Sequence, residues 1–208
     1  MKALFLLMLF FTGITTSISQ PLKEVKIGTQ IWTAQNLSVT KFANGENIPQ
    51  AKTAAEWDSA AKLEKPMWCY YNFLPENGKK YGILYNWYAV NDKRGLAPKG
   101  YRIPTAEDWL KLVDFSGGIM QAGKKLKSAT GWKNNGNGVN PNGFNGLPGG
   151  FLINNGIFSG LGETGGWWTS TEGEGSGAFV RYLEAEKNTS ETYSDFKLTG
   201  FSVRCLKK

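Results

Sequence analysis

The sequence predicts an α+β domain in which short helices come early, antiparallel strands come late, and a long glycine- and asparagine-rich loop region lies between them. Three observations lead to this prediction. Two segments with helix-capping signals lie before residue 120, glycine and asparagine dominate residues 131–166, and alternating apolar and polar residues fill residues 167–208. Because no regular alternation of strand and helix is present, a doubly wound parallel sheet is not expected.

The first twenty residues have the pattern of a signal peptide. Lys2 precedes a short apolar run from Ala3 to Phe11, and small polar residues continue to Gln20. A membrane-spanning helix needs about 20 apolar residues, so this run is too short to act as one. We therefore expect a cleaved signal over residues 1–19, no transmembrane segment, and one secreted domain over residues 25–208, in the periplasm or outside the cell.

The domain opens with a predicted hairpin and a predicted helix. Two short alternating segments, Glu24 to Ile27 and Gln30 to Ala34, flank Gly28, which is typical of a β-hairpin. Thr53 is followed three residues later by Glu56, and this capping-box spacing predicts a helix that extends to Leu63.

A second helix is expected after Pro104. Thr105 can cap it, Asp108 stands three residues further on, and the glycines at 117 and 118 end it. Its core-facing residues are Trp109, Leu112 and Val113. A weaker helical segment is expected over residues 119–127.

Residues 131–166 are predicted to form a long folded loop region, because glycine and asparagine adopt positive φ at little cost and interrupt regular strand pairing. The apolar residues within it need burial, so the region is not expected to be disordered. Four alternating segments then predict a terminal antiparallel sheet: WWTSTE, AFVRYLEAE, SETYSDFKL and GFSVRCLKK.

The charge pattern and the lack of histidine exclude several functions. The net charge of +7 comes from scattered lysines rather than a basic stripe, so we expect no nucleic-acid partner. With no histidine among 208 residues, Ser-His-Asp and Cys-His catalysis are excluded and a zinc site is not expected. Calcium is the one metal that the oxygen-rich composition leaves open, near residues 134–145, Glu172 and Glu174, but no calcium-loop spacing is present. We therefore predict no metal and no cofactor.

The chain contains two cysteines, Cys69 and Cys205. In an oxidising compartment they can form one intramolecular disulfide, which is the favoured prediction. The alternative is a pair of buried free thiols, because free cysteine is often a core residue.

Paired aromatic residues and loop amides provide the candidate contact residues. Adjacent side chains on a strand point to opposite faces, so one ring of a pair such as Trp167 and Trp168 is expected to face outward. Together with nearby polar groups, this gives five candidate ligand-binding residues: Trp167, Trp168, Asn142, Asn145 and Arg181. Carboxylates for a glycosidase-like pair are also available, at Asp58, Asp108, Glu172 and Glu184.

Six separated blocks, in the same order along the chain, resemble the Fibrobacter succinogenes major paralogous domain, a family common in Bacteroidetes and Fibrobacteres. The blocks are WCYYNF, YGILYNWYAV, LAPKGYRIPTAEDWLKL, GFNGLPGGF, WWTSTE and GFSVRCLKK. The resemblance implies a C-type-lectin-like fold, related to that of the formylglycine-generating and sulfatase-modifying proteins. It implies no activity, because the cysteine-based copper site of those enzymes has no match here.

These observations predict an exported, non-catalytic recognition or surface-associated domain, not an enzyme. It is expected to bind glycan or protein through the loop face between Trp132 and Trp168. Two alternatives are a hydrolase that uses paired carboxylates and a purely structural domain of a cell-surface assembly.

Overall fold

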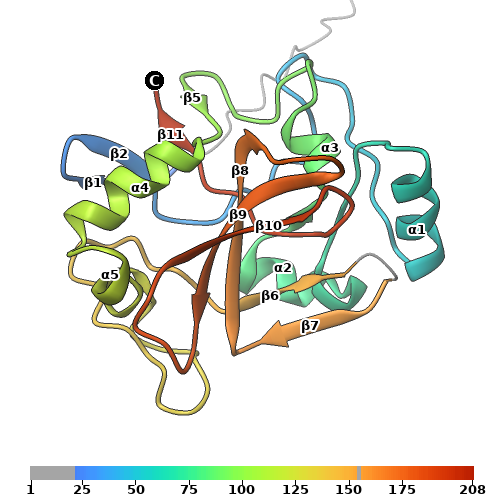
Figure 1. Ribbon diagram of the computed structural model, residues 1–208. Coiled ribbons are helices and arrows are strands. Elements are labelled where there is room, and N and C mark those ends of the chain that lie inside the picture. The colour runs from blue at the N-terminus through green and yellow to red at the C-terminus, as the bar shows by residue number, and fades with distance from the viewer. Residues whose placement is uncertain (1–21, 154–155) are drawn as a thin grey trace, which may run out of the picture.

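The two ends of the domain meet in one small sheet. A computed structural model describes residues 22–153 and 156–208 (Figure 1), so the predicted signal peptide lies outside the described residues. Strands β1 (Glu24–Ile27) and β2 (Gln30–Thr33) form the predicted hairpin. β2 also pairs with β11 (Leu206–Lys207), which pairs with β5 (Tyr101–Arg102), giving the order β1-β2-β11-β5.

A larger sheet of five strands forms the centre of the molecule, in the order β10-β9-β8-β6-β7. Its strands are β6 (Gly149–Leu152), β7 (Phe158–Leu161), β8 (Thr164–Glu172), β9 (Gly177–Glu184) and β10 (Glu191–Phe196). The pairs along it are antiparallel except β6 with β8. β3 (Trp68–Cys69) and β4 (Leu84–Tyr85) form a separate ribbon. The α+β class is thereby confirmed.

All three predicted helices are present: α1 (Ala54–Lys62), α4 (Ala106–Phe115) and α5 (Ile119–Leu126). Both capping boxes form, at Thr53 and at Thr105. The sequence did not predict α2 (Pro75–Tyr81), α3 (Trp87–Val90) or the 3-10 turn η1 (Tyr71–Phe73), which are short and lack a capping box. Among the described residues, no helix has the length and apolar character needed to cross a bilayer.

The predicted loop region is only partly irregular. Residues 128–148 contain no helix or strand, but β6, β7 and the start of β8 occupy much of 149–166. Gly150 shows why the glycine content misled the prediction. Its φ is +65°, and a Cβ there would lie 2.5 Å from the carbonyl oxygen of Ser159 on β7. Glycine here permits close strand pairing instead of interrupting it.

Both faces of the central sheet are covered, which corrects the expected orientation of Trp167 and Trp168. Trp167 packs with Trp109 of α4 on one face, and Trp168 packs with Phe201 on the other. Figure 1 shows α4 and α5 on one side of β8 and β9, with α1, α2 and α3 on the other. Both indole rings are fully buried, because β8 is an inner strand with packing on each side.

The predicted disulfide is absent: Cys69 and Cys205 are both buried free thiols. They belong to different parts of the core, since Cys69 packs in a cluster with Trp57 and Cys205 in one with Val203. Burial raises the pKa of Cys69 well above its ordinary value and raises that of Cys205 to about 12. Neither thiol is therefore a reactive thiolate at neutral pH.

Candidate functional site

A polar cavity of about 250 Å³ lies where three segments meet. The segment after β2, the second half of α2 and the loop before β6 form its walls. We call it the Asn36 cavity. Its lining residues are Ala34, Gln35, Asn36, Ser38, Gly78, Lys79, Lys80, Tyr81, Gly82, Asn145 and Leu147.

The side chain of Asn36 is fixed by four hydrogen bonds. Its Nδ2 donates to the carbonyl of Tyr81 at 2.8 Å and to the hydroxyl of Ser202 at 3.1 Å. Its Oδ1 accepts from Trp167 Nε1 at 2.8 Å and from Arg204 Nε at 2.7 Å. Because an amide side chain offers two donors and two acceptor positions, Asn36 is fully satisfied. It forms a rigid wall that joins α2, β8 and the C-terminal segment.

Arg204 lies behind this wall and is fully buried. Its Nη1 donates to the carbonyls of Thr33 and Phe144, each at 2.8 Å, and its Nη2 donates to the carbonyl of Asn145 at 3.0 Å. Within the described residues no carboxylate pairs with it. Burial lowers the pKa of Arg204 to about 9, so the guanidinium is charged at neutral pH. Carbonyl oxygens and the ring of Phe144, whose centroid lies 4.7 Å from the guanidinium carbon, compensate this charge in place of a carboxylate.

The rim of the cavity carries polar groups that are free to bind. In the part of the chain that the structure describes, no hydrogen bond engages the side chains of Gln35, Ser38, Lys79 or Asn145, or the hydroxyl of Tyr81. These groups offer donors and acceptors, and the Tyr81 ring adds an apolar surface. A rigid wall with unpaired polar groups around it is the arrangement that a small-ligand site needs.

Two glycines allow close packing around α2, one against Asn36 and one against Tyr70. Gly82 has a φ of +79°, and a Cβ there would lie 2.9 Å from the Cβ of Asn36. A Cβ on Gly78 would lie 2.2 Å from the ring of Tyr70. Any larger residue at either position would push the helix away, so these glycines determine the shape of the cavity.

Of the five predicted contact residues, only Asn145 lines the cavity. Asn142 is half-buried in the preceding turn and lies outside the lining. The prediction for Trp167, Trp168 and Arg181 is corrected, because all three are buried in the core and their side chains do not present a contact surface. Trp167 nevertheless supports the site, through its hydrogen bond to Asn36.

Arg181 faces the core because both sides of β9 are covered. It is 4% exposed, and its Nη1 donates to the carbonyl of Ser190 at 3.0 Å. Burial lowers its pKa to about 10.

The sequence did not point to five residues of the cavity and its wall: Asn36, Lys79, Lys80, Tyr81 and Arg204. A signal was available only for Arg204, namely a charged residue between the apolar residues Val203 and Cys205.

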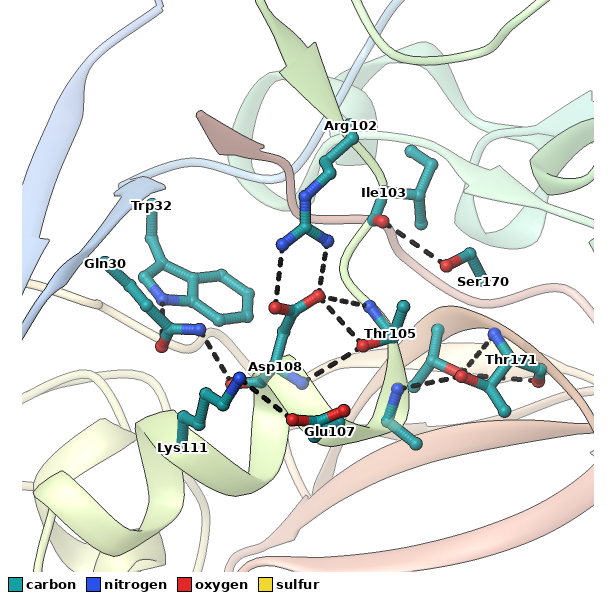
Figure 2. A network of polar contacts seen from close by, with 12 residues as sticks. Gln30, Trp32, Arg102, Ile103, Thr105, Glu107, Asp108, Lys111, Ser170 and Thr171 are labelled. Carbon is teal, nitrogen blue, oxygen red and sulfur yellow. Dashed lines mark hydrogen bonds and ion pairs between the residues drawn. The ribbon is translucent and has the colours of Figure 1, made fainter. Parts of the chain in front are cut away.

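In a second polar centre, a hollow of about 340 Å³ lies beside Arg102 and Asp108, but the carboxylate of Asp108 is itself fully hydrogen-bonded. Figure 2 shows Arg102 of β5 above the carboxylate of Asp108 at the start of α4. Asp108 accepts from both terminal nitrogens of Arg102, with the Nη2 contact at 2.7 Å, and from the backbone and hydroxyl of Thr105 at 2.8 and 2.9 Å. Burial opposes the shift, but the hydrogen bonds from Arg102 and Thr105 lower the pKa of Asp108 to about 2. This carboxylate joins elements and cannot act as a general acid at neutral pH.

The other candidate carboxylates are also paired. Asp58 contacts Lys62 at 2.7 Å, Glu172 contacts Lys197, and Glu184 contacts Lys187 at 3.0 Å. A separate hollow of about 300 Å³ gathers Glu163, Glu184 and Glu186, each of which contacts a lysine or an asparagine. In the described ranges, no group of three or more histidine, cysteine or acidic residues could hold a metal ion.

The fold and the site define an α+β domain that carries a small polar cavity with a rigid wall. The chain matches the Fibrobacter succinogenes major domain over residues 25–207 and belongs to this family. No curated protein and no solved structure matches the chain.

Proposed function

We propose that the protein is an exported, non-catalytic recognition domain with a C-type-lectin-like fold, and that it binds a glycan in the Asn36 cavity. One observation carries this proposal: unpaired amide, hydroxyl and ammonium groups surround a wall whose own hydrogen bonds are complete. Sugar hydroxyls both donate and accept, so they match such a rim. The ring of Tyr81 and the side chain of Leu147 can pack against the apolar face of a sugar.

The size of the cavity limits the ligand. Pockets for drug-sized ligands have volumes of about 300 to 1,000 Å³. At about 250 Å³, the Asn36 cavity suits one sugar unit, at a chain end or a branch, better than a long segment. Export, which residues 1–19 predict, would bring the domain to the surface polysaccharides or protein glycans that carry such units.

A glycan array followed by calorimetry tests the proposal. Wild-type protein is expected to bind at least one glycan, and Tyr81→Ala and Asn145→Gly are each expected to weaken that binding about tenfold. Glycine is chosen at position 145 because Asn145 has a φ of +55°. Tyr193→Ala is the matched control, since Tyr193 is an exposed aromatic residue on β10 that does not line the cavity. An array without signal, or unchanged binding by both cavity variants, would refute the proposal.

A further inference from the structure

We infer that the Asn36 cavity selects an acidic sugar unit, a uronate, and binds its carboxylate through Lys79 and Lys80. This inference rests on the proposed function, since it names the class of glycan that the same cavity takes. It follows from the charges around the cavity, from the pairing of lysines elsewhere in the chain, and from the buried guanidinium behind the wall.

The lining of the cavity is positively charged and contains no acidic residue. Lys79 and Lys80 stand on its α2 side, in the last turn of that helix. Arg204 adds a third positive charge, because its guanidinium donates to Asn36 and to the carbonyl of Asn145, two residues of the lining. Lys79 and Lys80 are exposed and Arg204 is buried, and positive charges that converge on one concave surface attract an anion.

Lys79 and Lys80 are among the lysines of the described residues that have no ion pair, and they are the two that line the cavity. Ion pairs to carboxylates engage six lysines of the described residues: Lys62, Lys111, Lys133, Lys187, Lys197 and Lys207. Neither cavity lysine is in such a pair within those residues; Lys80 only lies over the ring of Tyr81, at 4.9 Å from its centroid. Their charges are therefore available to a ligand.

The buried guanidinium explains why an anion is favoured over a neutral ligand. An ion removed from water without a counter-charge is costly, and carbonyl dipoles offset that cost only in part. A ligand carboxylate in the cavity would stand on the far side of Asn36 from Arg204 and would supply the missing negative charge. The amides of Gln35 and Asn145 and the hydroxyl of Ser38 remain for the sugar hydroxyls.

The test compares acids with their own esters. Oligosaccharides of galacturonate, glucuronate and mannuronate are titrated by calorimetry beside their methyl esters, which keep the sugar and remove the charge. At least one acid is expected to bind tenfold or more tightly than its ester in 50 mM NaCl, and this preference is expected to shrink in 500 mM NaCl. Lys79→Gln/Lys80→Gln is expected to weaken binding of the acid about tenfold or more and so to remove its preference over the ester.

Lys26→Gln/Lys41→Gln is the matched control, because it removes the same charge from two exposed lysines outside the cavity. Equal binding of acid and ester, or an unchanged preference in the cavity double variant, would overturn the inference and leave the proposed function intact. Tighter binding of a sulfated galactan oligosaccharide than of any uronate would overturn the carboxylate assignment. The absence of any bound glycan, neutral or acidic, would overturn both proposals.

Discussion

Arg102 and Arg204 are both removed from water at least in part, but different groups compensate their positive charges. The Arg102 side chain is 39% exposed and contacts Asp108 with both terminal nitrogens (Figure 2). Arg204 is fully buried and contacts three backbone carbonyls and the oxygen of Asn36. The first arginine has a counter-ion, and the second has none within the described residues.

The two arginines therefore differ in what they can do: Arg102 links β5 to α4, whereas Arg204 supports the cavity for which we propose ligand binding. At Asp108 the carboxylate oxygens are already occupied by Arg102 and Thr105, so the carboxylate and the guanidinium neutralise each other. At Arg204 most N–H donors of the guanidinium are already hydrogen-bonded, but within the described residues no carboxylate neutralises its positive charge. A cavity beside a positive charge that has no carboxylate partner can bind an anion. An ion pair between an arginine and a carboxylate instead holds together the two elements that carry these side chains.

Replacement of Arg204 by methionine is expected to have the largest effect on stability. Arg204→Met removes the guanidinium donor from the carbonyls of Thr33, Phe144 and Asn145, and it leaves Oδ1 of Asn36 with Trp167 Nε1 as its remaining donor. Breaking a buried charged network of this kind costs about 3 to 5 kcal/mol. Urea unfolding, followed by tryptophan fluorescence, would measure the loss in free energy of unfolding.

The matched replacement is Arg102→Met, which removes a partly exposed arginine and is expected to cost about 1 to 2 kcal/mol. Arg204→Lys keeps the charge with fewer donors and should fall between wild type and Arg204→Met. If Arg102→Met were as damaging as Arg204→Met, the contrast between the two arginines would be wrong.

The pH dependence of stability also distinguishes the Arg102–Asp108 pair from Arg204, because only the pair contains a carboxylate. The folded pKa of Asp108 is lowered to about 2 from an ordinary 3.8, so the carboxylate stabilises the fold above its unfolded pKa and loses this contribution as pH falls from about 4 to 2. Asp108→Asn is expected to cost about 1 to 2 kcal/mol at pH 7, a value reduced for the solvent around Arg102. The gap between wild type and variant should close near pH 2.

Urea unfolding of both proteins at several pH values between 7 and 2 would show this convergence. Comparing the two proteins removes the contribution of the other carboxylates, which titrate in both. A gap that stays constant down to pH 2 would mean that Arg102 does not stabilise the charged form of Asp108.

The sequence predicted the capping box at the start of α4 because its signal is local, but it did not predict that Arg102 pairs with Asp108. Thr105 and Asp108 stand three residues apart, and a capping box needs only that spacing and a helix that follows. The hairpin around Gly28 and the helix after Thr53 were predicted for the same reason. Each of these elements depends on residues that lie only a few positions apart in the sequence.

The Asn36 cavity could not be predicted in this way, because its parts are far apart in the sequence. Asn36, Tyr81, Trp167 and Arg204 meet only after β2, α2, β8 and the C-terminal segment have packed together. The burial of Trp167 and Trp168 was missed for a related reason. Strand alternation states that they point to opposite faces, but not that both faces are covered.

The smallest expected effect concerns the exposed ion pair beside Asp108. Lys111 contacts Glu107 one turn away on α4 at 2.9 Å, and the two side chains are 59% and 75% exposed. Exposed pairs at this spacing contribute only about 0.3 to 0.5 kcal/mol, because water and salt screen them. Lys111→Gln should therefore change the free energy of unfolding by less than about 0.5 kcal/mol in urea, with Asp108→Asn measured alongside as the larger reference. A loss as large as that of Asp108→Asn would show that the contact between Arg102 and Asp108 depends on the surface charges around it as well as on the hydrogen bonds of Asp108.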